Sequence, residues 1–439
     1  MHFLISLLNV FVGEAVHDLN VHVSFQHGDG IGLSWQSPLP VECDTVHYGT
    51  SQDDLSKTQR SQRDCNLYKG DKYHHTVLND LESGREFFYR ISCSYIIRSF
   101  RTPPRPGSSL SFRFGVYADL GPVHGEATIA ALHRMRDDLV GHIFAGDVGY
   151  ADDAFLHSEG YIARTNEFMK ALAASSERLP IMVSPGNHEA EDHTPVCLLS
   201  PNCRSGLGNF TAFNCIWNMP SEGNRHSMWS SFNYGPIHFV MSNTETDYEG
   251  APLEGYGEVG FIPAGSFGRK GEYEDWLRRD LIKAESERHI RPWIVVVGHR
   301  PVTVLDDHSD PFVTPLNQRI LDLITAHADA YIAGHVHYYA RSAPKPTSHV
   351  RTHFITVGGA GCDEWPERRI QDTRKGETEL FEYFGFGDEQ TFGTLAFDHD
   401  KPDELVFELQ TSAGGKVIDR VVIPKRPAAA VEHTVILTQ

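Results

Sequence analysis

Five short apolar segments between residues 112 and 333 each run into a polar loop, and this repeated pattern constrains the fold more than any other feature. They are predicted as strands at Phe112–Ala118, His142–Ala145, Leu179–Ser184, Trp293–Val297 and Ala330–Ala333. Apolar stripes at helical spacing lie between some of them and are interpreted as core faces: Ile129, Leu132, Met135 and Leu139; Trp276, Leu277, Leu281 and Ile282; Leu316, Ile320, Leu323 and Ile324. Strands that alternate with helices predict an α/β domain.

Side chains of the type that ligate metals follow all five predicted strands. They are Asp119, Asp147 with Tyr150, Asn187 with His188, His299, and His335 with His337. Taken singly, a Gly-Asp pair after a strand is usually a turn, and a lone His is usually a core residue. Ligands bind outside the carboxyl ends of strands in open α/β sheets, so the five loops are expected to converge on one crevice.

The donor atoms of this set indicate which metals it suits. It offers oxygen and imidazole nitrogen without a thiolate, as Fe, Zn or Mn prefer. Eight ligand positions for two metals require one residue to bridge them. Asp147 has two carboxylate oxygens and lies in the middle of the order, so it is the expected bridge.

The remaining chain divides into regions with different patterns. Residues 16–102 show short strands with turns between them and predict a β-sandwich. Residues 103–109 are rich in Pro, Gly and Ser and predict a linker. The catalytic region is expected over 110–424, with antiparallel strands from about residue 392, and 425–439 is a tail.

The N-terminus and the cysteines favour a secreted protein. An apolar run over residues 3–12 is too short to span a bilayer and fits a signal peptide over 1–15, although no Lys or Arg precedes it. The alternative is a short buried strand. Seven cysteines without a Cys-x-x-Cys motif favour disulfides over a structural zinc site, with Cys197 and Cys203 as the most local candidate pair and one thiol left over. Asn209 lies in the glycosylation sequon Asn-Phe-Thr.

The net charge limits the partners of the chain. There are 39 Lys and Arg against 58 Asp and Glu, which gives −19. Nonspecific binding to nucleic acid as a polymer is therefore disfavoured, and no transmembrane segment is predicted. An anionic substrate would need a local attraction, such as bound metal.

The five blocks resemble those of the purple acid phosphatases, within the calcineurin-like metallophosphoesterases. Tyr73–Glu82, Phe87–Ile91 and Phe100–Pro104 look like the fibronectin-III-like domain of the large plant-type members. Gly334-His-Val-His337 and Val357-Gly-Gly-Ala-Gly-Cys362 add to the resemblance. It implies two domains: an N-terminal all-β fibronectin-III-like sandwich and a C-terminal α/β metallophosphoesterase sandwich, with two β-sheets flanked by helices.

The family scheme implies a dinuclear metal centre. Fe(III) would take Asp119, Asp147, Tyr150 and His337, and a divalent Zn, Fe or Mn would take Asp147, Asn187, His299 and His335. Tyr150 distinguishes the purple acid phosphatases, because ordinary metallophosphoesterases carry a His two residues after the first Asp, where this chain has Gly121. With three ionised ligands the two metals leave a local charge of +2, which can attract phosphate despite the overall −19.

Three further residues are candidates for contact with the substrate. His188 is expected to hydrogen-bond the phosphate, with Glu189 holding it in orientation; simple packing is the alternative. Arg300 is a candidate for contact with phosphate or, equally, with an acidic side chain. His308 is a candidate general acid for the leaving group, because the resembled plant-type enzymes carry a His at this spacing; a solvated loop residue is the alternative. The segment from Pro301 to Leu305 lacks the aromatic residues common there in the family.

These features together predict a secreted acid phosphatase, extracellular or in the endomembrane lumen. It would hydrolyse phosphate monoesters by in-line attack of a metal-bound hydroxide at an Fe(III)–M(II) site. A phosphodiesterase or nucleotidase on the same site is the alternative, and an inactive binding protein is a more distant one. The expected partner is a phosphate-ester substrate, and a homodimer is kept as an option.

Overall fold

The N-terminal part of the chain forms a β-sandwich in the computed structural model. The model describes residues 19–37, 43–68, 70–108, 110–153, 160–190, 201–221, 227–253, 265–301, 320–364, 375–377 and 379–426. The first eight strands are β1 (His22–Phe25), β2 (Ile31–Ser37), β3 (Thr45–Gly49), β4 (Lys57–Arg60), β5 (Arg63–Asn66), β6 (Lys72–Leu78), β7 (Glu86–Ile91) and β8 (Arg98–Arg101). They make two antiparallel sheets, β1-β2-β6-β5 and β4-β3-β7-β8. These two sheets confirm the all-β class predicted for the N-terminal domain.

Strands and helices alternate after residue 110. The strands are β9 (Phe112–Tyr117), β10 (Gly141–Phe144), β11 (Ile181–Val183), β12 (Ser230–Tyr234), β13 (Ile237–Met241), β14 (Trp293–Val297), β15 (Ala330–Ala333), β16 (Tyr339–Pro344), β17 (His353–Val357), β18 (Lys375–Glu377), β19 (Phe381–Phe386), β20 (Thr391–Phe397), β21 (Glu404–Thr411) and β22 (Val417–Pro424). The helices are α1 (Glu126–Arg134), α2 (Gly160–Ser176), α4 (Pro201–Leu207), α5 (Thr211–Ile216), α6 (Glu272–Ser286) and α8 (Leu321–His327), with a short 3₁₀ helix at Asn187–Glu189.

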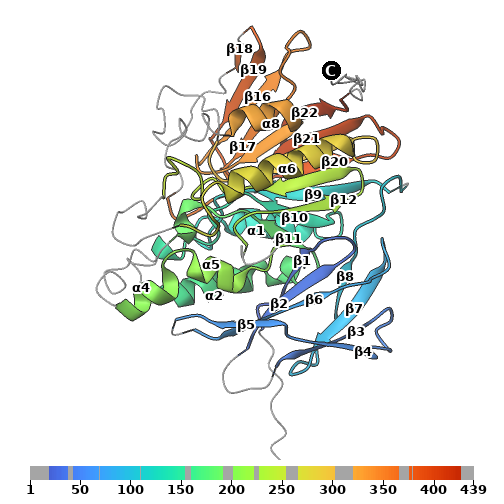
Figure 1. Cartoon of the computed structure of the whole chain (residues 1–439), viewed down its shortest axis with the longest axis vertical. Helices are drawn as coiled ribbons and strands as arrows, with labels where there is room; N and C mark the ends of the chain where they lie inside the picture. The colour runs from blue at the N-terminus through green and yellow to red at the C-terminus, as the bar shows by residue number, and fades with distance from the viewer. Residues whose placement is uncertain are drawn as a thin grey trace, which may run out of the picture.

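Two mixed sheets pack against each other in this second domain. One has the order β11-β10-β9-β20-β21-β22 and the other β12-β13-β14-β15-β17-β16-β19-β18. Aromatic side chains join them: the ring centroids of Phe114 and Phe239 lie 5.2 Å apart, and those of Trp293 and Phe397 lie 5.7 Å apart. Helix α6 packs on α8 and on β14 (Figure 1). The predicted α/β sandwich is thus confirmed.

Parallel strands of both sheets bring the polar loops together. In the first sheet β9 and β10, and β10 and β11, run parallel. In the second, β13, β14, β15 and β17 run parallel in that order. The polar residues follow the carboxyl ends of β9, β10, β11, β14 and β15. This is the edge at which open α/β sheets bind ligands.

Two of the predicted apolar stripes are longer than the buried face of the helix to which each belongs. Helix α1 ends at Arg134, so Met135 and Leu139 lie in the turns that follow it. Ile282 of α6 is 52% exposed, which corrects the expectation of a core position. It lies on the outer face, because Leu277 and Leu281 already fill the side toward β14. Within the described residues no helix is long and apolar enough to cross a membrane.

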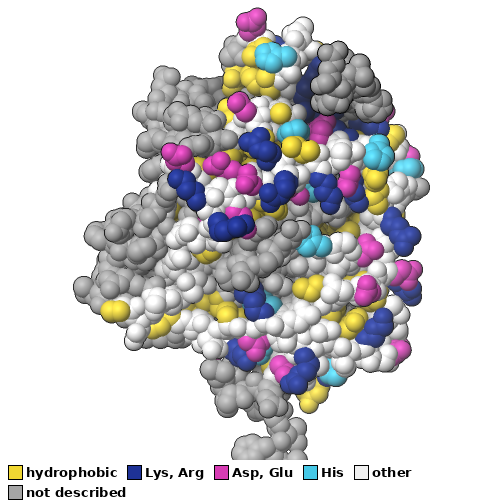
Figure 2. All heavy atoms as spheres, in the orientation of Figure 1, with side chains coloured by type: hydrophobic (Ala, Val, Ile, Leu, Met, Phe, Trp, Pro, Cys, Tyr) yellow, Lys and Arg dark blue, Asp and Glu magenta, His cyan; other side chains and the backbone are white. Residues whose placement is uncertain are grey.

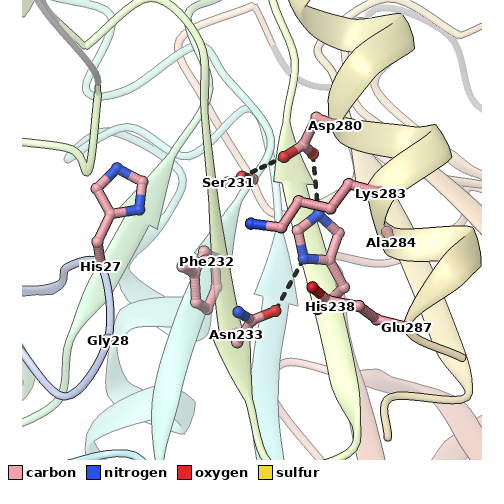
Figure 3. A pocket seen from close by; sticks show the side chains of 10 residues that line it. All are labelled: His27, Gly28, Ser231, Phe232, Asn233, His238, Asp280, Lys283, Ala284 and Glu287. Carbon is pink, nitrogen blue, oxygen red and sulfur yellow. Dashed lines mark hydrogen bonds and ion pairs between the residues drawn. The ribbon is translucent and has the colours of Figure 1, made fainter. Parts of the chain in front are cut away.

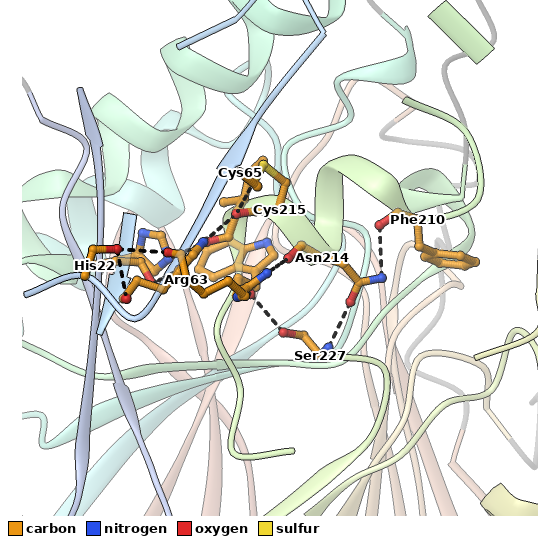
Figure 4. Close-up of a disulfide and its surroundings, with 12 residues drawn as sticks. His22, Arg63, Cys65, Phe210, Asn214, Cys215 and Ser227 are labelled. Atoms are coloured by element: carbon orange, nitrogen blue, oxygen red, sulfur yellow. Dashed lines mark hydrogen bonds between the residues drawn. A yellow bond between two sulfur atoms is a disulfide. The ribbon is translucent and has the colours of Figure 1, made fainter. Parts of the chain in front are cut away.

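The N-terminal sandwich holds the end of helix α5 through a series of backbone carbonyls. Arg63 donates to the carbonyl oxygens of residues 214 and 217, and the imidazoles of His75 and His22 lie 2.8 and 2.9 Å from those of residues 215 and 216 (Figure 4). Ser24 and Gln26 both donate to the next carbonyl, of Asn218. The last carbonyls of a helix lack partners within it. Side chains of the other domain supply those partners here.

Two disulfides between described residues fit the predicted oxidising compartment. Cys43–Cys93 closes the N-terminal sandwich, and Cys65–Cys215 joins the two domains beside α5 (Figure 4). Cys203 is also disulfide-bonded, while its predicted partner Cys197 lies outside the described residues. Cys362 is buried with a free thiol, as the odd count of cysteines requires.

Removing the interdomain disulfide should lower stability substantially. The bond joins residues 150 positions apart, and a cross-link of that length stabilises by about 4–5 kcal/mol in the chain-entropy model. We expect the double variant Cys65→Ala/Cys215→Ala to unfold at a temperature several degrees lower, measured by calorimetry on purified protein. Cys43→Ala/Cys93→Ala, which opens a 50-residue loop within one domain, is the comparison, and the same chain-entropy model gives a loss of about 4 kcal/mol for it. An unchanged midpoint in the interdomain variant would contradict a clamping role.

A small polar pocket lies where the β1–β2 turn approaches the second domain. His27 and Gly28 line it together with residues of β12, β13 and α6 (Figure 3). His238 lies 2.8 Å from Asn233 Oδ1 and 2.9 Å from Asp280 Oδ2, which ties the strands to the helix. His238 is near the amino end of β13, so this pocket is at the opposite end of the strands from the polar loops.

Candidate metal centre

The loops after β9, β10 and β15 bend sharply at the predicted ligands. Asp119, Asp147, Tyr150 and His335 all have positive φ angles, between 48° and 71°. A residue other than Gly in this region costs about 1–3 kcal/mol, and such residues concentrate at functional sites. The bends bring four side chains from three loops toward one point.

Glycines next to these residues permit the close approach of the loops. A Cβ atom added at Gly186 would lie 2.2 Å from Asp147 Oδ1, and one added at Gly334 would lie 2.5 Å from Asp119 Oδ2. Distances this short exclude any side chain. Gly186 therefore lets two loops of the same sheet meet, and Gly334 lets a loop of one sheet approach a loop of the other.

Three of the predicted ligands form one group of donor atoms. The Tyr150 hydroxyl donates to Asp119 Oδ1 over 3.1 Å and lies 3.0 Å from His337 Nε2. All three side chains are buried. Burial, and then the nearby Asp119 and Asp147 carboxylates, raise the pKa of the Tyr150 phenol well above its usual range.

Three other predicted ligands form a second group. Asn187 Oδ1 lies 3.1 Å from His299 Nε2 and 3.1 Å from His335 Nδ1. The other ring nitrogen of His299, Nδ1, lies 2.9 Å from the carbonyl oxygen of Ala145, which fixes the ring. Such a contact behind a ligating imidazole is the usual way in which metal sites orient histidine.

Asp147 lies between the two groups. Its Oδ2 atom is 3.0 Å from His299 Nε2 in one group and 3.4 Å from the Tyr150 hydroxyl in the other. Asp147, His299 and His335 also place one donor atom each within 4.8 Å of one another. Burial alone would raise the pKa of Asp147, but His299 and His188 outweigh it and hold the pKa below its usual range.

The structure corrects the expected role of Glu189. Its carboxylate accepts backbone N–H groups of Asp147 and Gly186 through Oε2 and of Val148 through Oε1, over 2.7 to 3.0 Å. It therefore ties the Asp147 loop to the Asn187 loop and does not orient His188. Both oxygens of the Glu189 carboxylate accept backbone N–H groups. The position of Glu189 in the sequence motif does not reveal this role.

Asp152 holds His188 instead. The Asp152 Oδ2 atom lies 2.8 Å from His188 Nδ1, while the other ring nitrogen, Nε2, lies 4.0 Å from Asp147 Oδ2. Burial works against a charged imidazole, but Asp152 and Asp147 raise the pKa of His188 well above its usual range. Sequence reasoning missed Asp152, although it lies two residues after Tyr150.

Arg300 is fully buried against Glu245. Its Nε atom donates to Glu245 Oε2 over 3.0 Å and to Oε1 over 3.2 Å, and neither side chain is exposed to solvent. Arg300 Nη1 lies 3.1 Å from His335 Nε2. Of the two roles considered for Arg300, this geometry supports contact with an acidic side chain. Glu245 gave no signal in the sequence, because no strand-end motif contains it.

The structure does not describe the predicted general acid, because His308 lies outside the described residues. Asn209 lies between α4 and α5, is partly buried, and has a φ of 53°. One thiol and one carboxylate that were not predicted as site residues also lie close to the cluster. Cys362 Sγ is 3.8 Å from the His337 ring nitrogens, and Glu364 Oε2 is 4.0 Å from His337 Nε2.

Comparison with known families agrees with this arrangement. The family model for calcineurin-like phosphoesterase matches residues 112–339, more than half of the chain, and that for the purple acid phosphatase N-terminal domain matches residues 19–102. The chain belongs to the purple acid phosphatases of the calcineurin-like phosphoesterase family. This membership confirms the predicted family, fold class and enzyme class.

Individual relatives cover most of the chain. Acid phosphatase A of Cryphonectria parasitica is 28% identical and covers 90% of both chains. Purple acid phosphatase 18 of Arabidopsis thaliana is 26% identical over 84% of this chain and 76% of that protein. Among solved structures, a purple acid phosphatase from yellow lupin seeds superposes with a TM-score of 0.68 at 19% identity, over 92% of this chain and 74% of that chain. That likeness shows the shared fold.

Proposed function

We propose that this purple acid phosphatase hydrolyses phosphate monoesters at a dinuclear centre of Fe(III) and a divalent Zn, Fe or Mn. The observation that carries the proposal is the position of Asp147 between two groups of donor atoms, 3.4 Å from one and 3.0 Å from the other. Each group offers donors of the hard or borderline type that these cations prefer. The relatives named acid phosphatase support the same activity.

The two groups divide the ligands between the cations. Asp119, Tyr150 and His337 would hold Fe(III), since a buried phenol gives up its proton only to a strongly polarising cation. Asn187, His299 and His335 would hold the divalent cation, and Asp147 would bridge. When bound, the cations would acidify a water molecule and withdraw negative charge from the phosphoryl group.

Residues around the cations would bind and orient the substrate. His188 is held by Asp152 through Nδ1, which leaves Nε2 to donate a hydrogen bond to a phosphoryl oxygen. Against the effect of burial, the Asp152 carboxylate raises the pKa of this imidazole, which favours the protonated form. Glu189 and the Arg300–Glu245 pair fix the loops that carry Asp147 and His335. His308 stays the proposed general acid for the leaving alkoxide.

A phosphodiesterase or nucleotidase on the same centre is the second candidate function, since the ligand set does not distinguish the two. An inactive binding protein fits less well. Such a protein would not need seven side chains, which together supply eight metal-ligand positions, to converge on one place. One relative of Arabidopsis thaliana, 24% identical, is named a probable inactive purple acid phosphatase.

The disulfides support the proposal that the protein is secreted, with a signal peptide over 1–15 and a glycan on Asn209.

Metal analysis together with an ester panel tests the proposal. The purified protein should contain close to one iron and one further metal per chain, and it should hydrolyse p-nitrophenyl phosphate and alkyl phosphates below pH 7. Metal-free protein prepared with a chelator should be inactive and regain activity on reloading. A protein that binds neither metal, or that binds both and hydrolyses no phosphate ester, would contradict it.

Tyr150→Phe should abolish any visible charge-transfer absorption of the iron-loaded protein while the fold stays intact. The change removes the hydroxyl that lies within 3.4 Å of Asp119, Asp147 and His337, and keeps the buried ring. Visible absorption and circular dichroism measure the two effects separately. If the variant binds iron and keeps the same band as the unaltered protein, Tyr150 is not a ligand.

A further inference from the structure

Hydrogen bonds hold the loop that follows β17 at three points beside the candidate metal centre. Gly121 N–H donates to the carbonyl of Gly361 over 2.9 Å, and the Thr128 hydroxyl donates to the carbonyl of Ala360. Buried Arg164 donates to both carboxylate oxygens of Asp363, over 3.0 and 3.1 Å. The backbone up to residue 363 is thus fixed by α1, α2 and the Asp119 loop.

This fixed loop presents Glu364 at the solvent side of the centre. Glu364 Oε2 lies 3.8 Å from His188 Nε2 and 4.0 Å from His337 Nε2, and its side chain is 46% exposed. The carboxylate therefore faces both the residue proposed to bind the phosphoryl group and a residue proposed to bind Fe(III).

Glu364 acts on this region through its charge, because both distances exceed those of a hydrogen bond. His188 does not need it for orientation, since Asp152 already holds Nδ1 at 2.8 Å. Burial, and then the negative charges of Asp152, Glu364 and Asp363, raise the pKa of Asp153, so several carboxylates lie around that residue. Arg164, the arginine that contacts this loop, pairs with Asp363, so the imidazoles of His188 and His337 are the groups that face Glu364.

We propose that Glu364 is a specificity-determining residue that disfavours dianionic phosphate groups relative to monoanionic ones, so that the centre accepts phosphodiesters beside monoesters. The proposal rests on the proposed function. A monoester carries two negative charges at neutral pH and a diester carries one, and repulsion from a fixed carboxylate scales with that charge. Solvent screening at a half-exposed position limits the effect to roughly fivefold.

The test compares two substrates that share a leaving group, p-nitrophenyl phosphate and bis(p-nitrophenyl) phosphate, at pH 7 with the metal-loaded full chain. Glu364→Gln keeps the shape of the side chain and removes its charge. We expect kcat/KM for the monoester to rise about fivefold and that for the diester to rise only about twofold, because the diester carries half the charge. Glu167→Gln is the control, because Glu167 is similarly exposed at 54% and also lies near Arg164; its ratio should not move.

Equal changes on both substrates, or a change in favour of the diester, would overturn the proposal. A binding measurement separates this result from a failure of the proposed function. Calorimetry with sulfate, which carries two charges, and dimethyl phosphate, which carries one, needs no turnover. If the unaltered protein hydrolyses neither ester, the proposed function fails, while tighter sulfate binding by Glu364→Gln alone still supports the charge effect. Unchanged sulfate affinity would refute it.

Discussion

Replacing Asp147 with Asn should remove at least one metal from the protein and lower kcat by at least about a thousandfold. The amide keeps the shape of the side chain but loses a negative charge and one of two equivalent oxygen donors. Asp147 Oδ2 alone approaches both donor groups, at 3.0 Å from His299 Nε2 and 3.4 Å from the Tyr150 hydroxyl. Metal ions contribute several kcal/mol of transition-state stabilisation, and each 1.36 kcal/mol is about tenfold in rate.

Metal content by mass spectrometry and turnover of p-nitrophenyl phosphate measure the two effects. Asp280→Asn is a suitable control, because the Asp280 carboxylate also lies beside an imidazole, that of His238, but at the other end of the strands. Circular dichroism shows whether the variants fold. Retention of both metals at full occupancy with normal turnover would refute the bridging role of Asp147.

The positions of the candidate ligands could be predicted because they obey a rule that links sequence to topology. A polar residue directly after a buried parallel strand lies at the carboxyl edge of the sheet, whatever the rest of the chain does. Asp119, Asp147, Asn187, His299 and His335 all follow such strands. Sequence order alone therefore placed residues that are more than two hundred positions apart into one cluster.

The supporting residues could not be predicted, because their roles depend on distances between loops. Glu189 and Asp152 both lie near His188, and only the structure shows that Glu189 binds backbone N–H groups while Asp152 binds the imidazole. Glu245 and Arg300 are 55 positions apart and meet because β13 and β14 are adjacent. Glu364 lies near the centre because contacts from distant parts of the chain hold its loop, among them that of Arg164 with the neighbouring Asp363.

The Arg300–Glu245 pair should be the most sensitive ion pair near the centre. Both side chains have zero exposure and meet over 3.0 Å. Thr244 supports the pair, since its hydroxyl donates to Glu245 Oε1 and accepts the backbone N–H groups of His299 and Arg300. Removing one partner of such a pair leaves an uncompensated charge in the interior, which costs about 3–5 kcal/mol.

Glu245→Gln should therefore lower the free energy of unfolding by about 3–5 kcal/mol, measured by denaturant titration. Arg300→Met should cost a similar amount, and the double variant Glu245→Gln/Arg300→Met should be clearly more stable than the sum of the two losses predicts, since no charge is left unpaired. Single losses below about 1 kcal/mol, or strictly additive losses in the double variant, would show that the pair is not coupled as the structure indicates.

The same variants separate an effect on folding stability from an effect on binding of the divalent metal. Arg300 Nη1 lies 3.1 Å from His335 Nε2, on the side of the ring away from Asn187. Loss of Arg300 frees that ring to rotate, so the Arg300→Met and double variants should both bind the divalent metal more weakly even where the double variant regains stability. Iron content should fall less, because His337, Tyr150 and Asp119 do not contact the pair in the described residues. Equal loss of both metals would instead indicate that the whole centre depends on the fold of this loop.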